Sequence, residues 1–264
     1  MPLTELEIES IAKALIKAEE ERNPIDPITD GHPYITIEDA YKIQKKVVEI
    51  KLFTKKGLRV VGKKIGLTSK AMQKMFGIDQ PDYGHLFNYM YVEDGSTISL
   101  SELIQPRIEA EIAFVLKEDL EGPGVTVADV LRAAEGVMPA LEIIDSRIKN
   151  WKIKIQDTIA DNASSGKFVL GGVLVPVKDL DLRLIGMVLE VNGEVVATAT
   201  GAAVLGNPAT AVAWLANKLA EYGEKLRKGE IILSGSFVAA VPVEKGMFVK
   251  ATFSRLGAVS IKFI

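Results

Sequence analysis

The N-terminal part of the chain carries hydrophobic residues at helical spacing. Between residues 4 and 21 the apolar side chains recur every three or four positions, as on one face of an α-helix. Thr4 and Glu7 have the spacing of a capping box at its start. Thr36 and Asp39 mark the start of a second such stripe. The pattern predicts two helices joined by a loop, within an N-terminal helical part over residues 1–58.

From residue 59 onward the pattern changes to apolar runs that are typical of strands. Asn192-Gly193 between two such runs predicts a type I′ hairpin. Asn207-Pro208 has the order of an N-cap and a first helical residue, so it predicts one late helix. The expected strands are 59–68, 104–116, 137–144, 168–177, 231–237, 247–253 and 258–263. Strands joined by turns with few helices favour an α+β fold, with residues 59–264 as a β-rich catalytic core continuous with the helical part.

The stretch between the first two predicted strands mixes a short helix with a polar turn. Residues 69–76 have helical composition, and residues 78–84 have turn composition. That turn nevertheless contains Asp79, Asp82 and Tyr83. Polar chemistry in a loop is a mild indication of function.

Composition excludes several classes of protein. The 264 residues contain no cysteine and only two histidines, which argues against thiolate chemistry, zinc–thiolate sites and a Ser-His-Asp triad. A net charge of −3 gives no global field for nucleic acid or anionic lipid, and no apolar run reaches the length of a membrane span. We expect a cytoplasmic protein without nucleic-acid or membrane partners.

Three glutamates are the first candidate site. Glu109 and Glu111 lie two residues apart in a predicted strand, so their carboxylates share one face. Glu142 lies among apolar residues in another predicted strand, where a charge is rarely left unpaired. Together they could hold a hard cation such as Mg²⁺ or Mn²⁺. The alternative is a solvated pair of glutamates, with Glu142 in a salt bridge to an arginine.

Lys64 is the second candidate. It lies between Gly62 and Gly66 on an apolar strand, and a lysine in a partly buried site loses proton affinity and can take part in acid–base chemistry. The alternative is a surface lysine beside Lys63. Spacing alone does not choose between the two.

Seven blocks, in order along nearly the whole chain, resemble the 2-keto-4-pentenoate hydratase and 4-oxalocrotonate decarboxylase group of the fumarylacetoacetate hydrolase superfamily. They are residues 62–70 (GKKIGLTSK), 79–84 (DQPDYG), 106–111 (PRIEAE), 141–147 (LEIIDSR), 161–166 (DNASSG), 201–208 (GAAVLGNP) and 233–236 (LSGS). Several ordered blocks are more specific than any single motif. The resemblance implies a mixed β-roll or barrel-like core.

The resemblance also implies the chemistry. It assigns Mg²⁺ or Mn²⁺ to Glu109, Glu111 and Glu142, acid–base roles to Lys64 and Asp79, and substrate contacts to Leu67, Ser164, Ser234 and Ser236. The implied reaction is addition of water to 2-hydroxypenta-2,4-dienoate, giving 4-hydroxy-2-oxopentanoate in the meta-cleavage of aromatic compounds. A homo-oligomer is expected.

Three alternatives stay open. The first is a 4-oxalocrotonate decarboxylase, which shares the metal and lysine blocks. The second is a C–C hydrolase, which is less favoured because neither His32 nor His85 lies in a matching block. The third is a non-catalytic subunit of a complex between the paired hydratase and decarboxylase.

Overall fold

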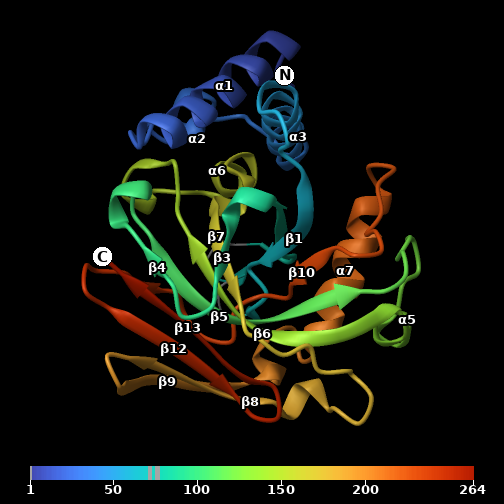
Figure 1. Cartoon of the computed structure of the whole chain (residues 1–264). Helices are drawn as coiled ribbons and strands as arrows, with labels where there is room; N and C mark the ends of the chain where they lie inside the picture. Colours follow the sequence, from blue (N-terminus) through green and yellow to red (C-terminus); the bar gives the residue numbers. More distant parts are fainter. Residues whose placement is uncertain (1, 71–72, 75–77) are drawn as a thin grey trace.

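The computed structural model describes residues 2–70, 73–74 and 78–264. Its N-terminal part is helical, with α1 (Glu5–Glu21), α2 (Ile28–Gly31) and α3 (Ile37–Thr54). The predicted capping box of Thr4 with Glu7 is confirmed, and Thr36 with Asp39 forms a second one at the predicted start of α3. These helices form a layer above the β-rich remainder (Figure 1).

The described remainder of the chain contains two sheets. The larger sheet has the strand order β2-β1-β10-β5-β6-β7-β3, with β11 also paired to β5. It is curled, and the second sheet, of order β4-β13-β12-β8-β9, lies below it in Figure 1. The α+β architecture with a barrel-like core is therefore confirmed.

The strands of the larger sheet are short except at its centre, where β5 and β6 pair over ten register positions. The bounds are β1 (Val60–Gly66), β2 (Asp82–Phe87), β3 (Tyr91–Glu93), β5 (Arg107–Leu116), β6 (Ala134–Ile144), β7 (Ser165–Leu170), β10 (Ile231–Leu233) and β11 (Val241–Pro242). The smaller sheet contains β4 (Thr97–Ile98), β8 (Gly186–Val191), β9 (Glu194–Thr200), β12 (Phe248–Phe253) and β13 (Gly257–Phe263).

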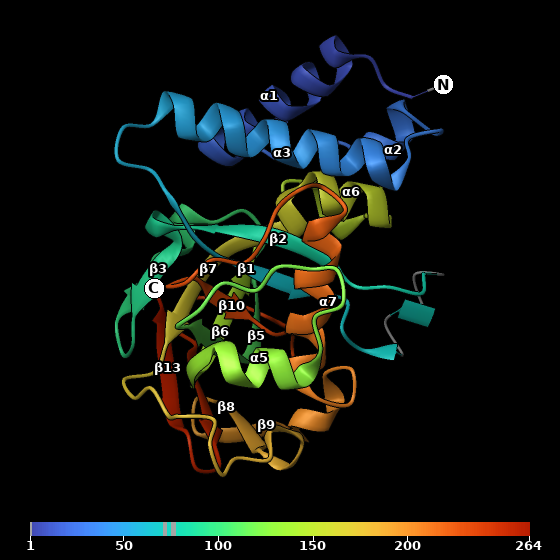
Figure 2. The ribbon, with the colours of Figure 1, turned by 90° about the vertical axis from the view of Figure 1, so that its right-hand side faces the viewer.

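Within the described residues, three further α-helices cover the sheets: α5 (Val127–Ala133), α6 (Ile155–Ala160) and α7 (Pro208–Ala220). Asn207 is the N-cap of α7 and Pro208 its first residue, as predicted. In Figure 2, α7 runs alongside the larger sheet and α6 lies between that sheet and the N-terminal helices. The Gln44 amide of α3 donates to the carbonyls of Tyr83 (2.9 Å) and Ile159 (2.8 Å), which ties the helical layer to β2 and α6.

Several predicted boundaries were wrong. Residues 82–84 were predicted as turn but form the start of β2, because they pair with β1 from Gly66↔Asp82 to Lys64↔Gly84. Conversely, β7 and β10 end earlier than the apolar runs that predicted them. The hairpin at Asn192-Gly193 is confirmed, and both residues have positive φ as a type I′ turn requires. The predicted helix at 69–76 lies partly outside the described residues.

The proposed division after residue 58 falls in the connection between α3 and β1. Apolar residues on both sides of it, including Ile8, Ile43 and Ile65, belong to one buried cluster. The division into residues 1–58 and 59–264 within one continuous unit stays a prediction.

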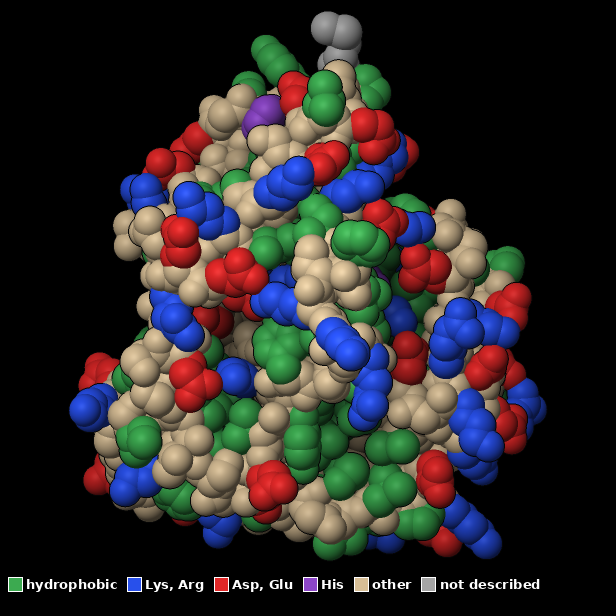
Figure 3. Space-filling view, turned by 45° about the horizontal axis from the view of Figure 1, so that its top comes forward, with side chains coloured by type: hydrophobic (Ala, Val, Ile, Leu, Met, Phe, Trp, Pro, Cys, Tyr) green, Lys and Arg blue, Asp and Glu red, His purple; other side chains and the backbone are tan. Residues whose placement is uncertain are grey.

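The surface carries charges of both signs. Lysine and arginine side chains are interspersed with aspartate and glutamate on the face shown in Figure 3. Among the described residues, no helix combines the length and apolar character needed to cross a membrane.

An ion pair between a buried lysine and a half-buried glutamate joins the two long N-terminal helices. Lys51 on α3 is 2% exposed, and its ammonium group donates to Glu19 of α1, which also accepts from the Tyr89 hydroxyl at 2.7 Å. Burial alone would raise the pKa of Glu19, but attraction by Lys51 and both hydrogen bonds lower this pKa to about 2. Burial also lowers the pKa of Lys51.

Glu19→Gln is therefore expected to lower the free energy of unfolding by about 3 kcal/mol at pH 7, because it leaves the Lys51 ammonium without its counter-charge. Since the folded pKa lies below the unfolded value near 4.5, the Glu19 charge stabilises the fold above that pH and loses its effect as pH falls towards 2. Urea unfolding at pH 7 and pH 3 measures the difference. The control is Glu20→Gln, whose pair with Lys55 is exposed. An equal loss for both variants would contradict the prediction.

Candidate active site

Strand register brings the three predicted glutamates together. Glu109 on β5 lies directly opposite Glu142 on β6, and Glu111 follows two residues along the same face. One carboxylate oxygen from each residue lies within 4.8 Å of the other two. Glu111 and Glu142 are fully buried and Glu109 is half-buried. The alternative of a solvated surface pair is therefore wrong.

Lys64 reaches the same cluster from β1. Its ammonium is 3.3 Å from Glu142 Oε1, and its side chain is buried. Lys63 points the opposite way and pairs with Glu230 at 3.1 Å. Burial lowers the pKa of Lys64, but attraction by Glu142, Glu109 and Asp82 outweighs it, so the pKa lies above its ordinary value. In this set of groups the expected loss of proton affinity is therefore not found, and the acid–base role of Lys64 stays a prediction.

Asp82, not Asp79, joins the cluster. Asp79 is exposed and borders a separate cavity of about 430 Å³ beside α3 and α6. Asp82 is 1% exposed at the start of β2, and neither of its carboxylate oxygens has a hydrogen-bond partner among the described residues. It lies opposite Gly66, where an added Cβ would come within 2.2 Å of Asp82 Oδ1 and 3.5 Å of Lys64 Nζ. The glycine thus allows Asp82 to approach Lys64.

The four predicted substrate-contact residues stay predictions, and the structure places them in different surroundings. Ser234 is fully buried, and its Oγ has no partner among the described residues. The Ser236 hydroxyl donates to the Val238 carbonyl (2.6 Å), and the Ser164 hydroxyl to Asp161 (3.2 Å). Leu67 is half-buried at the end of β1, with positive φ. The O–H donors of Ser164 and Ser236 are therefore used within the protein, and their hydroxyl oxygens can still accept a hydrogen bond from a ligand.

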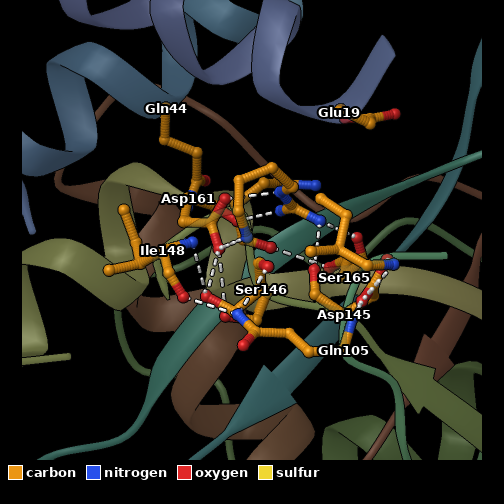
Figure 4. A network of polar contacts seen from close by, with 12 residues as sticks. Glu19, Gln44, Gln105, Asp145, Ser146, Ile148, Asp161 and Ser165 are labelled. Carbon is orange, nitrogen blue, oxygen red and sulfur yellow. Dashed lines mark hydrogen bonds and ion pairs between the residues drawn. The ribbon is translucent and has the colours of Figure 1, made fainter. Parts of the chain in front are cut away.

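A buried network supports this end of the sheet. The Arg147 guanidinium pairs with Asp161 and donates to the carbonyls of Asp145 and Ser165. The Asp145 carboxylate accepts from the backbone of Gln105 (2.7 Å), just before β5 (Figure 4). This network fixes the segments that enter β5 and leave β6.

The donor set fits a hard divalent cation. All three converging ligands are carboxylates, which suit Mg²⁺ or Mn²⁺. Glu111 Oε2 accepts from the Gly235 N–H at 2.8 Å, but Glu111 Oε1 is buried without a partner among the described residues. Burial, then repulsion by Glu142 and Glu109, raises the pKa of Glu111 well above its ordinary value. Burial likewise raises the pKa of Glu142 to about 7, even though Lys64 opposes the shift. A cation would relieve the repulsion and satisfy the free oxygens.

Comparison with known proteins gives consistent matches. Residues 61–263 match the family model of the fumarylacetoacetate (FAA) hydrolase C-terminal region. The chain is 48% identical to the 2-hydroxyhexa-2,4-dienoate hydratase of Comamonas testosteroni, over 97% of each chain. It is 44% identical to the 4-oxalocrotonate decarboxylase of Pseudomonas sp. strain CF600, over 99% of this chain and 98% of that one. The solved structure of the Pseudomonas putida G7 4-oxalocrotonate decarboxylase, complexed with magnesium and adipate, superposes with a TM-score of 0.96 at 42% identity over 99% of each chain.

Proposed function

Because the chain belongs to the fumarylacetoacetate hydrolase family, we propose that it is a divalent-metal-dependent lyase that hydrates 2-hydroxypenta-2,4-dienoate or a close relative. The observation that carries the proposal is the convergence of three carboxylates with one buried lysine and one buried aspartate. We propose Glu109, Glu111 and Glu142 as the ligands of Mg²⁺ or Mn²⁺. When bound, the cation would supply Lewis-acid polarisation of the 2-oxygen of the substrate.

The reaction requires proton transfers to and from specific atoms of the substrate. A proton leaves the 2-hydroxyl group and a proton reaches C5, giving 2-oxopent-3-enoate. Water oxygen then adds to C4 and a proton reaches C3, giving 4-hydroxy-2-oxopentanoate. In our proposal Lys64 holds a positive charge beside the developing enolate, and Asp82 exchanges protons with water and the carbon chain.

Decarboxylation of 4-oxalocrotonate is the second candidate, favoured by the near-complete superposition on a decarboxylase. The first assay follows the ultraviolet absorbance of 2-hydroxypenta-2,4-dienoate with Mg²⁺, and again with EDTA. The second measures CO₂ release from 4-oxalocrotonate. Metal-dependent loss of the dienoate supports the hydratase. CO₂ release from 4-oxalocrotonate, with no loss of the dienoate in the first assay, supports the decarboxylase. Neither activity would favour a non-catalytic subunit. A homo-oligomer and a complex between the paired enzymes stay predictions.

Asp82→Asn is expected to lower kcat by about 10²- to 10⁴-fold, because an amide cannot exchange protons. The matched control is Asp79→Asn in the exposed turn nearby, which should keep the wild-type rate. Steady-state kinetics measures both, with circular dichroism as a check of folding. Loss of activity in Asp79→Asn with retention in Asp82→Asn would instead restore Asp79 as the acid–base residue.

A further inference from the structure

Arg107 lies on the same strand face as the carboxylate cluster. The proposed chemistry does not use its positive charge. Arg107 is the first residue of β5, two positions before Glu109. Strand alternation puts Arg107, Glu109 and Glu111 on one face, and two residues of strand span about 7 Å. Arg107 is half-buried, as is Glu109, whereas Glu111 further along the strand is fully buried. Arg107 therefore lies at the more exposed end of the carboxylate cluster.

The charge of Arg107 is not neutralised within the described part of the chain. No ion pair or hydrogen bond of its guanidinium group is found there, in contrast to the Arg147 guanidinium, which is paired with Asp161. Instead the Arg107 Cζ atom lies 4.6 Å from the centroid of the Trp151 ring. Stacking on an indole uses the face of the guanidinium and leaves its N–H donors at the edge available for an anion.

The Trp151 ring is itself fixed in place. Its Nε1 donates to the Gln105 carbonyl at 3.0 Å. The Gln105 amide donates to the carbonyls of Ser146 and Ile148, and the Gln105 N–H donates to Asp145, within the network of Figure 4. Trp151 has positive φ (54°), which a bulky residue adopts only when its surroundings impose it. The plane on which Arg107 stacks is therefore set before any ligand arrives.

Charge balance indicates what Arg107 would bind. Four carboxylates (Glu109, Glu111, Glu142 and Asp82) face Lys64 and one divalent cation, which leaves a net negative charge when all four are ionised. An anionic substrate entering such a site needs a further cation. Asp82 and Lys64 lie on β2 and β1, whereas Arg107 lies on β5 at the more exposed end of the cluster. One side of the site thus offers the acid–base groups Asp82 and Lys64, and the other offers the positive charge of Arg107 to an anionic end of the substrate.

We propose that Arg107, stacked on Trp151, binds the C1 carboxylate of the 2-oxo acid substrate and so directs C4 and C5 towards Lys64 and Asp82. This inference rests on the proposed function, because it assumes a 2-oxo acid at the carboxylate cluster. It makes Arg107 a substrate-binding residue that selects for a carboxylate beside the carbonyl.

The test uses Arg107→Met, with Arg107→Lys as a milder variant and Arg132→Met, an exposed arginine on α5, as the control. Calorimetry first measures binding of Mg²⁺ alone, then binding of oxalate to the Mg²⁺-loaded protein. Oxalate affinity should fall about 10- to 100-fold in Arg107→Met and less in Arg107→Lys, because a charge-assisted bidentate bond is lost. Mg²⁺ affinity should not fall. Unchanged oxalate binding, or an equal loss of Mg²⁺ binding, would overturn the proposal.

Kinetics supplies the second readout. If Arg107 binds the C1 carboxylate, Arg107→Met should raise KM for 2-hydroxypenta-2,4-dienoate and for an analogue with a second, distal carboxylate by a similar factor. A selective loss for the dicarboxylate would place Arg107 at the distal end and overturn the proposed orientation. Absence of turnover in the wild-type protein would refute the proposed function, while oxalate binding would still decide the role of Arg107.

Discussion

Replacing Glu111 by glutamine should weaken Mg²⁺ binding by at least about 100-fold and, at the same time, raise the melting temperature of the metal-free protein. The amide keeps the shape of the side chain and its bond from the Gly235 N–H, but it removes one charged ligand. That loss corresponds to about 2.7 kcal/mol of binding free energy. The melting temperature should rise because the buried carboxylates repel one another, and burial with this repulsion raises the pKa of Glu111.

Calorimetry with Mg²⁺ and thermal unfolding in EDTA measure the two effects. Glu118→Gln is the matched control, since it makes the same substitution at an exposed position beyond the end of β5. Wild-type Mg²⁺ affinity in Glu111→Gln would remove Glu111 from the ligand set. A lower melting temperature without metal would show that its charge is not a source of strain.

Replacing Lys64 by methionine should lower turnover about 10³-fold without weakening Mg²⁺ binding. Methionine fills a similar volume but carries no charge, so the protonated group beside the substrate is lost. A bound cation would be repelled by the Lys64 ammonium, which lies 3.3 Å from Glu142. Removing the ammonium should therefore leave Mg²⁺ affinity unchanged or increase it.

The neighbouring lysine provides the control. Lys63 is buried too, but it points away from the cluster and pairs with Glu230. The double variant Lys63→Met/Glu230→Gln removes that pair without leaving an isolated charge, and it should keep most of the activity. If Lys64→Met works at the wild-type rate, Lys64 has no catalytic role.

Local signals in the sequence were enough to predict much of the fold. The capping box at Thr4, the Asn192-Gly193 turn and the N-cap at Asn207 depend on neighbouring residues alone, and all three are found. Strand alternation also placed Glu109 and Glu111 on one face. The same alternation includes Arg107, so its place beside the cluster could have been predicted.

Other features of the candidate site depend on long-range strand pairing, which the sequence alone does not predict. Residues 78–84 have turn composition throughout, and only pairing with β1 makes Asp82 a strand residue and leaves Asp79 outside. The contact between Glu109 and Glu142 likewise depends on the register of β5 and β6. The raised pKa of Lys64 could not be predicted either, because it depends on carboxylates from three other strands.

The two adjacent lysines of β1 pose a problem of strand register. A slip of one residue would put Lys63 in the place of Lys64, so a lysine would still enter the site. The flanking glycines exclude this slip. A Cβ at Gly62 would lie 1.8 Å from the Ile231 carbonyl oxygen, and one at Gly66 would lie 2.2 Å from Asp82 Oδ1. After such a slip, Val61 and Ile65 would occupy these positions. The Val61 side chain would clash with the backbone of Ile231, and the Ile65 side chain would push the Asp82 carboxylate aside. Gly62 and Gly66 thus fix the register of β1, so that Lys64 and not Lys63 faces the carboxylates.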